Sequence, residues 1–129
     1  MINIDAMMAT PGSLTRGRTY KQVLIDAREH ISDINRWTQQ AYARDEEGNN
    51  VRPRDPKACC WCMLGAVAYC SNDVGIIPPP LLSFLEQMVP FHCGKDKFVG
   101  PGSMNDYYNH ESVLSFLDHA IDLFPKEAP

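Results

Sequence analysis

The residues in this sequence most able to do chemistry are its five cysteines, Cys59, Cys60, Cys62, Cys70 and Cys93. A cysteine acts as a nucleophile in its thiolate form, which a helix N-terminus or a neighbouring histidine favours. Cys62 is the candidate of that kind, because four histidines elsewhere in the chain are available as partners. The other interpretation is a buried thiol that packs as a small apolar side chain, and this is what we expect for Cys62.

The place of Cys62 in its predicted helix decides between these interpretations. Asp55-Pro56 is typical of a helix start, because aspartate accepts bonds from unpaired N–H groups and proline fits the first helical position. The helix predicted from Pro56 to about Cys70 puts Cys62 at its seventh position, beyond the first turn where the helix dipole acts. We therefore expect a buried, inert thiol in the middle of a helix.

A zinc site is the second chemistry that the cysteines suggest. Cys59 and Cys62 have the C-x-x-C spacing, and His92 with Cys93 could complete a set of four ligands. Such pairs usually lie in turns rather than inside a helix, and no second C-x-x-C or H-x3-H pair follows. We expect no metal and no other cofactor, and these four residues are the alternative metal set.

Charge is distributed unevenly along the chain. Residues 66–129 carry three Lys/Arg and eight Asp/Glu, a balance of −5, against +1 for residues 1–65. Direct nucleic-acid binding is not expected of the second half, since phosphate binding needs clustered cations. The sequence leaves two interpretations of these acids: a solvated face, or a surface that binds a host protein through that protein's basic surface. The candidate binding residues are Asp106, Glu111, Asp118 and Asp122.

Length and composition fit one domain. The chain has 129 residues, of which 44% are hydrophobic and 22% charged, as in ordinary globular domains. Residues 1–18 have little periodicity and predict a flexible N-terminal arm, and residues 19–129 predict a single helical domain. No apolar run is long enough for a membrane span, and the clustered, odd-numbered cysteines favour reduced thiols. We expect a cytoplasmic protein.

Hydrophobic periodicity predicts a mainly α fold, with about four helices around a central apolar helix and one small β-hairpin. The central helix is Pro56–Cys70, which is apolar nearly all round. Residues 42–51 have the turn residues of the hairpin, and residues 92–104 read as a surface loop. The other predicted elements are a helix opened by a capping box at Thr19 and Gln22, a short helix Leu81–Val89 that Pro90 ends, and a last helix capped by Asn109 with Leu117 in its apolar stripe.

Several short motifs together resemble an uncharacterised family of small bacterial and phage proteins. The order W-C-x-x-G-A, then N-D, then a helix ending in L-D-x-A-I is not generic. The similarity covers about residues 20–66 and 105–122. The matching residues are Trp37-Thr-Gln, Tyr42-Ala-Arg-Asp with Gly48, Asp55-Pro, Trp61-Cys-Met-Leu-Gly-Ala66, Asn105-Asp106 and the segment from Glu111 to Ile121.

This resemblance implies a shared fold and a phage or bacterial setting, without an activity to carry over. It implies that Cys62, Gly65, Asn105 and Asp106 are pattern positions. Structural roles can account for them: Gly65 with Ala66 makes a flat patch that another helix can approach closely. Asn105-Asp106 can bond loop backbone before the last helix.

For function, the sequence favours a non-enzymatic protein-binding module. We expect a phage-type accessory or inhibitor that docks on a host defence or nucleic-acid-handling protein, because no complete catalytic constellation is present and the second half is acidic. The alternative is a small cysteine-dependent hydrolase or transferase centred on Cys62, with Asn105 and Asp106.

Overall fold

The structure is a computed structural model that describes residues 13–15, 17–93 and 100–124, with the backbone alone for 91–93. Within these residues the fold is mainly α with a small antiparallel sheet, which confirms the predicted fold class. Five α-helices are described instead of about four. They are α2 (Tyr20–His30), α3 (Met63–Ser71), α4 (Pro79–Cys93), α5 (Pro101–Tyr107) and α6 (His110–Leu123), and a short 3-10 helix, η1, spans Ile34–Arg36.

The first and last of these helices begin as their capping residues predict. The Thr19 hydroxyl accepts a hydrogen bond from the backbone N–H of Gln22 at 3.0 Å, and the Asn109 side chain accepts one from Ser112 at 2.8 Å. Each cap satisfies an N–H group that has no partner inside the helix. The apolar stripe of α6 faces the core, where Leu117 is fully buried.

The central helix starts seven residues later than predicted. Asp55 does not begin a helix, because its carboxylate accepts from the N–H of Lys57 at 2.8 Å and closes a turn. Residues Cys60–Trp61 form strand β3, and α3 begins at Met63. The prediction of Pro56–Cys70 was therefore wrong at its start, although α3 is buried nearly all round.

The predicted hairpin exists, and β3 extends it. Strands β1 (Ala43–Arg44) and β2 (Asn50–Val51) pair antiparallel with Ala43 opposite Val51. On its other edge β1 pairs with β3, so that Ala43 also lies opposite Trp61 and the strand order is β2-β1-β3. The last strand of the small sheet therefore ends one residue before α3 begins.

Two predictions between residues 81 and 104 were wrong. Helix α4 does not end before Pro90 but contains it, because a proline can kink a helix without stopping it. The predicted surface loop 92–104 contains the start of α5, with Pro101 in the first turn, where its missing N–H costs no hydrogen bond. Met104 in this stretch is fully buried. Residues 94–99 lie outside the described residues.

The predicted arm is described only at its end, since residues 1–12 lie outside the described residues. Thr15 donates its backbone N–H to the Ser71 carbonyl at 3.0 Å. Arg18 binds Asp26 at 2.7 Å and the Cys70 carbonyl at 2.9 Å. Residues 13–18, where described, therefore contact the end of α3.

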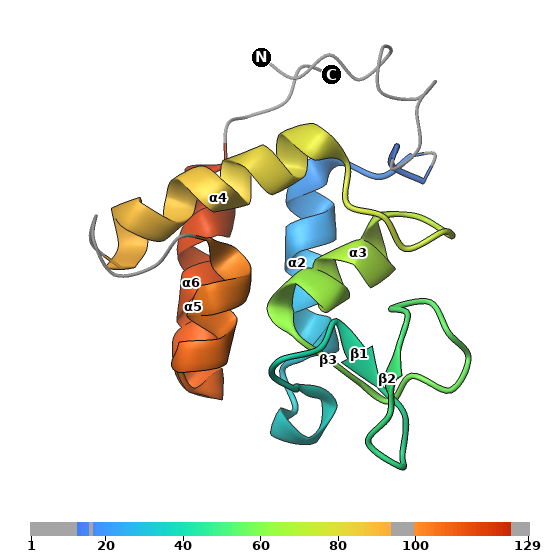
Figure 1. Cartoon of the computed structure of the whole chain (residues 1–129). Helices are drawn as coiled ribbons and strands as arrows, with labels where there is room; N and C mark the ends of the chain where they lie inside the picture. Colours follow the sequence, from blue (N-terminus) through green and yellow to red (C-terminus); the bar gives the residue numbers. More distant parts are fainter. Residues whose placement is uncertain (1–12, 16, 94–99, 125–129) are drawn as a thin grey trace.

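Figure 1 shows how these elements are arranged: α4 lies across one end of α2 and α6, and the sheet lies at the other end of the molecule, below α3. Helix α2 packs on α3 and α6, and α5 packs on α3, α4 and α6. Within residues 13–15, 17–93 and 100–124, no helix is long and apolar enough to cross a membrane.

Candidate functional site

Cys62 is the N-cap of α3, which corrects its predicted place in the middle of a helix. Its backbone N–H donates to the Tyr42 carbonyl at 3.2 Å, and its sulfur accepts from the N–H of Gly65 at 3.2 Å. The sulfur therefore takes the part that a serine or aspartate oxygen usually plays at a helix start. The strand β3 and its pairing with β1 fix this position, which the helix pattern alone could not indicate.

The Cys62 thiol is nonetheless poorly suited to nucleophilic chemistry. Only 6% of the residue is exposed, and this burial raises the pKa of the thiol to about 11, although the N–H groups of Gly65 and Leu64 act in the opposite direction. The charge of Asp106 raises the pKa further. Activated cysteines have a depressed pKa instead, so the expected buried thiol is the state that the structure favours.

Asn105 lies at the centre of a buried polar junction beside Cys62. Its side-chain oxygen accepts from the indole N–H of Trp37 at 2.8 Å and from the backbone N–H of Met63 at 3.0 Å. Its amide nitrogen donates to the Thr38 carbonyl at 3.1 Å, and the residue is fully buried. One side chain therefore ties α5, the start of α3 and the segment after η1 together.

Asp106 and Gln39 complete this arrangement, which we call the Asn105 junction (residues 37–40, 62–63 and 105–106). Asp106 accepts from the backbone N–H of Gln40 at 2.7 Å, where Gln40 has a left-handed φ of 64°. Gln39 donates to the carbonyls of Asn105 at 3.0 Å and of Asp106 at 3.1 Å. The unusual backbone at Gln40 is thus held by a carboxylate.

Gly65 lets backbone, rather than a helix, approach α3. A Cβ atom at Gly65 would lie 1.8 Å from the Tyr42 carbonyl oxygen and 2.7 Å from its carbon. This is the same carbonyl that accepts from the N–H of Cys62. The expected flat patch therefore exists, but its occupant is the segment leading into β1.

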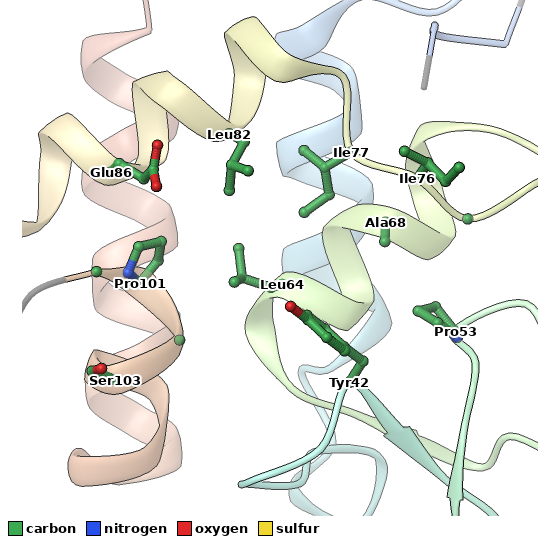
Figure 2. Close-up of a pocket in the computed structure, with 13 residues that line it drawn as sticks. Tyr42, Pro53, Leu64, Ala68, Ile76, Ile77, Leu82, Glu86, Pro101 and Ser103 are labelled. Carbon is green, nitrogen blue, oxygen red and sulfur yellow. The ribbon is translucent and has the colours of Figure 1, made fainter. Parts of the chain in front are cut away.

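A groove runs along the surface next to the junction. Its larger hollow has a volume of about 620 Å³ and a second one of about 510 Å³, and the two adjoin at Tyr42, Leu64 and Gly102. Figure 2 shows Leu64 of α3 and Leu82 of α4 pointing toward one another across the larger hollow, with the Tyr42 ring below them. We call the two hollows together the Tyr42 groove.

The Tyr42 groove combines apolar walls with one acidic residue in each hollow. Large hydrophobic side chains on its walls are open to solvent: Tyr42 is 59% exposed and Ile76 45%. Glu86 lines the larger hollow and Asp106 the smaller one. No lysine, arginine or histidine lines either hollow in the part of the chain that the structure describes. Neither acid is in an ion pair among the described residues.

Sequence reasoning missed the groove because its walls come from segments far apart in the chain. One local signal was available: Ile76-Ile77 stands between Gly75 and Pro78, and an apolar pair in a turn region has no helix or strand stripe to bury it.

The structure separates the four acids of the predicted binding set. Asp106 lines the Tyr42 groove, whereas Glu111, Asp118 and Asp122 are exposed on α6. Asp118 accepts from Arg28 of α2 at 2.7 Å and is therefore paired within the chain. An in-chain guanidinium already compensates the middle of the predicted stripe.

The three residues of the alternative cysteine site do come together. Asp106 and Cys62 line the same hollow, and Asn105 bonds the N–H that follows Cys62. The contacts described for His30 and His110 lead elsewhere, to Trp61 and Trp37 respectively. These contacts therefore provide no base for the thiol, and the charge of Asp106, which lines the same hollow, disfavours the thiolate.

The described residues do not bring the alternative metal ligands together. Cys59 precedes β3 and is half-buried, while Cys62 is the buried helix cap on the other side of that strand. The side chains of His92 and Cys93 lie outside the described residues. Elsewhere in the described chain, no three His, Cys, Asp or Glu side chains gather as a metal site would require.

One known protein family matches most of the chain. The model of a family of unknown function, DUF6197, matches residues 15–123, which include every described helix and strand. The chain belongs to this family. The expected resemblance to an uncharacterised family is thereby confirmed, and the Asn105 junction and the Tyr42 groove both lie within the matched residues. Neither a curated protein nor a solved structure matches the chain.

Proposed function

We propose that this member of the family is a non-enzymatic protein-binding module whose Tyr42 groove takes an apolar segment of a partner protein with cationic residues at its ends. One observation carries the proposal: an apolar groove has a carboxylate in each hollow, Glu86 and Asp106, and no cation lines it among the described residues. An apolar segment would cover the exposed side chains of Tyr42 and Ile76. Lysine or arginine residues of that segment would pair with Glu86 and Asp106.

The chemistry of the groove also suggests the kind of partner. Basic segments are commonest on proteins that handle nucleic acids. A cytoplasmic phage-type accessory or inhibitor that docks on such a host protein, or on a host defence protein with a basic surface, fits an acidic groove. In this proposal the partner is a protein and the module does not bind nucleic acid directly.

The cysteine-dependent enzyme is the weaker candidate. Cys62, Asn105 and Asp106 adjoin one hollow, but Asn105 has both ends of its amide engaged in structural bonds. Burial raises the pKa of the Cys62 thiol to about 11, and no base is described beside it. These contacts explain the three residues as the framework of the groove.

Peptide display with the purified protein as bait tests the proposal. The library carries random 12-residue peptides, and selection against the Ile76→Asp variant removes peptides that bind elsewhere. Ile76 is 45% exposed, so this change should leave the fold intact, which thermal melting checks. We expect enriched peptides with apolar centres and Lys or Arg at one or both ends, and weaker binding at high salt. Enrichment that is equal on both baits, or that favours acidic peptides, would contradict the proposal.

Charge variants then locate the binding surface. Glu86→Gln and Asp106→Asn keep the shape of each side chain, and Asp106→Asn keeps an oxygen for the Gln40 N–H. Each should weaken a selected cationic peptide about tenfold, as loss of one charge-assisted contact does. Asp122→Asn on α6 is the matched control and should leave affinity unchanged. If Asp122→Asn has the larger effect, the α6 surface is the interface; if binding scales with self-association in sedimentation, a second copy occupies the groove.

A further inference from the structure

The two acids of the Tyr42 groove differ in how firmly the fold holds them. Asp106 Oδ1 accepts a hydrogen bond from the backbone N–H of Gln40 at 2.7 Å and a longer one from the amide nitrogen of Asn105 at 3.4 Å. Glu86 is exposed on α4 and has no hydrogen bond or ion pair within the described chain. A carboxylate already held in place loses less conformational entropy when a ligand binds than a free one does.

Asp106 nonetheless keeps capacity to bind a ligand. A carboxylate has about four lone-pair sites on its two oxygens, and both of the described bonds go to Oδ1. Within residues 13–15, 17–93 and 100–124, Oδ2 accepts no hydrogen bond. Asp106 lines the smaller hollow of the groove, so Oδ2 is the oxygen available to a donor that enters there.

The arginine beside the smaller hollow does not neutralise Asp106. Arg44 donates to the side-chain oxygen of Asn50, a residue that lines this hollow, at 2.8 Å. The other bonds described for the Arg44 guanidinium go to two backbone carbonyls and one hydroxyl, at 3.0–3.2 Å. All of these acceptors are neutral, and the two ion pairs of the described chain do not include Asp106. The carboxylate of Asp106 therefore still lacks a cationic partner in that part of the chain.

The walls of the smaller hollow suit a long side chain with a flat cationic end. Gly102 lies four positions before Asp106 on α5, and both residues line the hollow. Residues four apart share a helix face, so the missing side chain of Gly102 leaves space beside the carboxylate. The nearest neighbour of a Cβ atom at Gly102 would be Leu64 Cδ1 at 3.7 Å. The Tyr42 ring, which Figure 2 shows beside Leu64, adds an aromatic wall that is 59% exposed.

We propose that the smaller hollow is an arginine pocket, in which Asp106 binds the guanidinium of an arginine of the partner segment and the Tyr42 ring packs against it. This inference rests on the proposed function of the groove. A guanidinium is more weakly hydrated than an ammonium and stacks on aromatic rings, so an apolar, aromatic wall beside a fixed carboxylate favours arginine over lysine. Glu86, which the described contacts do not hold, pairs with either cation at the larger hollow.

Single exchanges in a selected peptide, made with arginine at both ends, test the arginine pocket. Lysine at one end should weaken binding about tenfold, and lysine at the other end should change it less than about twofold. Citrulline, which keeps the shape of arginine without its charge, should weaken binding at both ends. In the Asp106→Asn variant the difference between arginine and lysine should disappear. Equal tolerance of lysine at both ends, or a difference that persists in Asp106→Asn, would overturn the proposal.

N-acetyl-arginine amide probes the pocket without a selected peptide. The backbone amide of Gln40 donates to Asp106 and is therefore the NMR reporter. Arginine amide should shift this signal and bind about tenfold more tightly than lysine amide, and citrulline amide should not shift it. Asp106→Asn should abolish the shift, whereas Asp122→Asn, the matched control on α6, should leave it unchanged. Melting temperatures verify that both variants fold.

The two experiments separate this inference from the proposed function. If arginine amide binds at Gln40 but no peptide is selected, the proposed peptide ligand is wrong, while the preference of the hollow for a guanidinium stands. If peptides bind but arginine amide and lysine amide shift the Gln40 signal alike, the arginine pocket is wrong and the groove keeps its proposed function.

Discussion

The Asn105 junction and the Tyr42 groove are neighbours that share Gln40, Cys62 and Asp106, yet they are built in opposite ways. In the junction, polar groups meet partners at 2.7–3.1 Å, and Asn105 at its centre is fully buried. In the groove, large apolar side chains and two acids face solvent. Three pieces of the motif that carries the family resemblance lie in the junction: Trp37-Thr-Gln, Cys62-Met63 and Asn105-Asp106. Their contacts explain the fold better than they explain function.

The largest effect should come from Gly65→Ala. The new Cβ would lie 1.8 Å from the Tyr42 oxygen, which is a backbone atom and cannot simply rotate away. We expect a loss of more than about 3 kcal/mol in the free energy of unfolding, above the usual range for overpacking. Denaturant unfolding measures it. Gly102→Ala is the control: its nearest neighbour would be Leu64 Cδ1 at 3.7 Å, so alanine should be neutral or slightly stabilising in this helix. Equal losses for both variants would refute the close approach.

Asn105→Ala should cause the second-largest loss in the free energy of unfolding. It leaves the Trp37 indole N–H, the Met63 N–H and the Thr38 carbonyl without their partner, and buried groups of this kind cost about 1–3 kcal/mol each when unsatisfied. We expect a loss of about 3 kcal/mol by chemical denaturation, while exposed Asn49→Ala should change stability by less than about 0.5 kcal/mol. A loss below about 1 kcal/mol would mean that water or neighbours replace the amide.

The Cys62 thiol, which lies between the two regions, should react slowly. With a pKa of about 11 it holds roughly a hundredth of the thiolate of a thiol with a pKa near 9. Iodoacetamide labelling at pH 7, read by peptide mass spectrometry, should be about a hundredfold slower at Cys62 than in the denatured chain. Since the unfolded thiol releases its proton first, stability should also fall as pH rises from about 9 to about 11. Labelling of native Cys62 as fast as in the denatured chain would favour the enzyme.

The smallest effect on stability should come from the groove itself. Tyr42→Ser removes a side chain that is 59% exposed but leaves the Tyr42 carbonyl, which supports Cys62 and touches Gly65. We expect a change of less than about 0.5 kcal/mol in thermal or chemical unfolding, together with weaker binding of a selected peptide. A strongly destabilised variant would show that the Tyr42 ring stabilises the fold, and the difference drawn here between the groove and the junction would then be wrong.

The parts of this fold that local signals specify were predictable. Thr19 and Asn109 cap helices through bonds to residues three positions away, so sequence spacing contains all the information needed. The hairpin turn is local in the same sense. Leu117, chosen from the periodicity of the last helix, is fully buried.

The errors arose where distant residues decide. Cys60–Trp61 becomes a strand because β1, seventeen positions earlier, offers an edge, and this pairing moves the helix start from Pro56 to Met63. Asp55 does accept a hydrogen bond from a backbone N–H, that of Lys57, but this bond closes a turn instead of starting a helix. The Tyr42 groove was missed for the same reason, since α3, α4, α5 and the residue before β1 each contribute to its walls, and only the Ile76-Ile77 pair gave a local signal.

The long reach of the Asn105 side chain bears on how the chain folds. Its bond to Trp37 closes a separation of 68 residues and its bond to Met63 one of 42. Such closures lose chain entropy before they gain contacts, whereas α2, α6 and the hairpin form from nearby residues. The junction should therefore assemble after the folding transition state, and removing its amide should accelerate unfolding while leaving the refolding rate nearly unchanged. Asn105 would then act mainly on the unfolding rate, which sets the lifetime of the native state, and little on the folding rate.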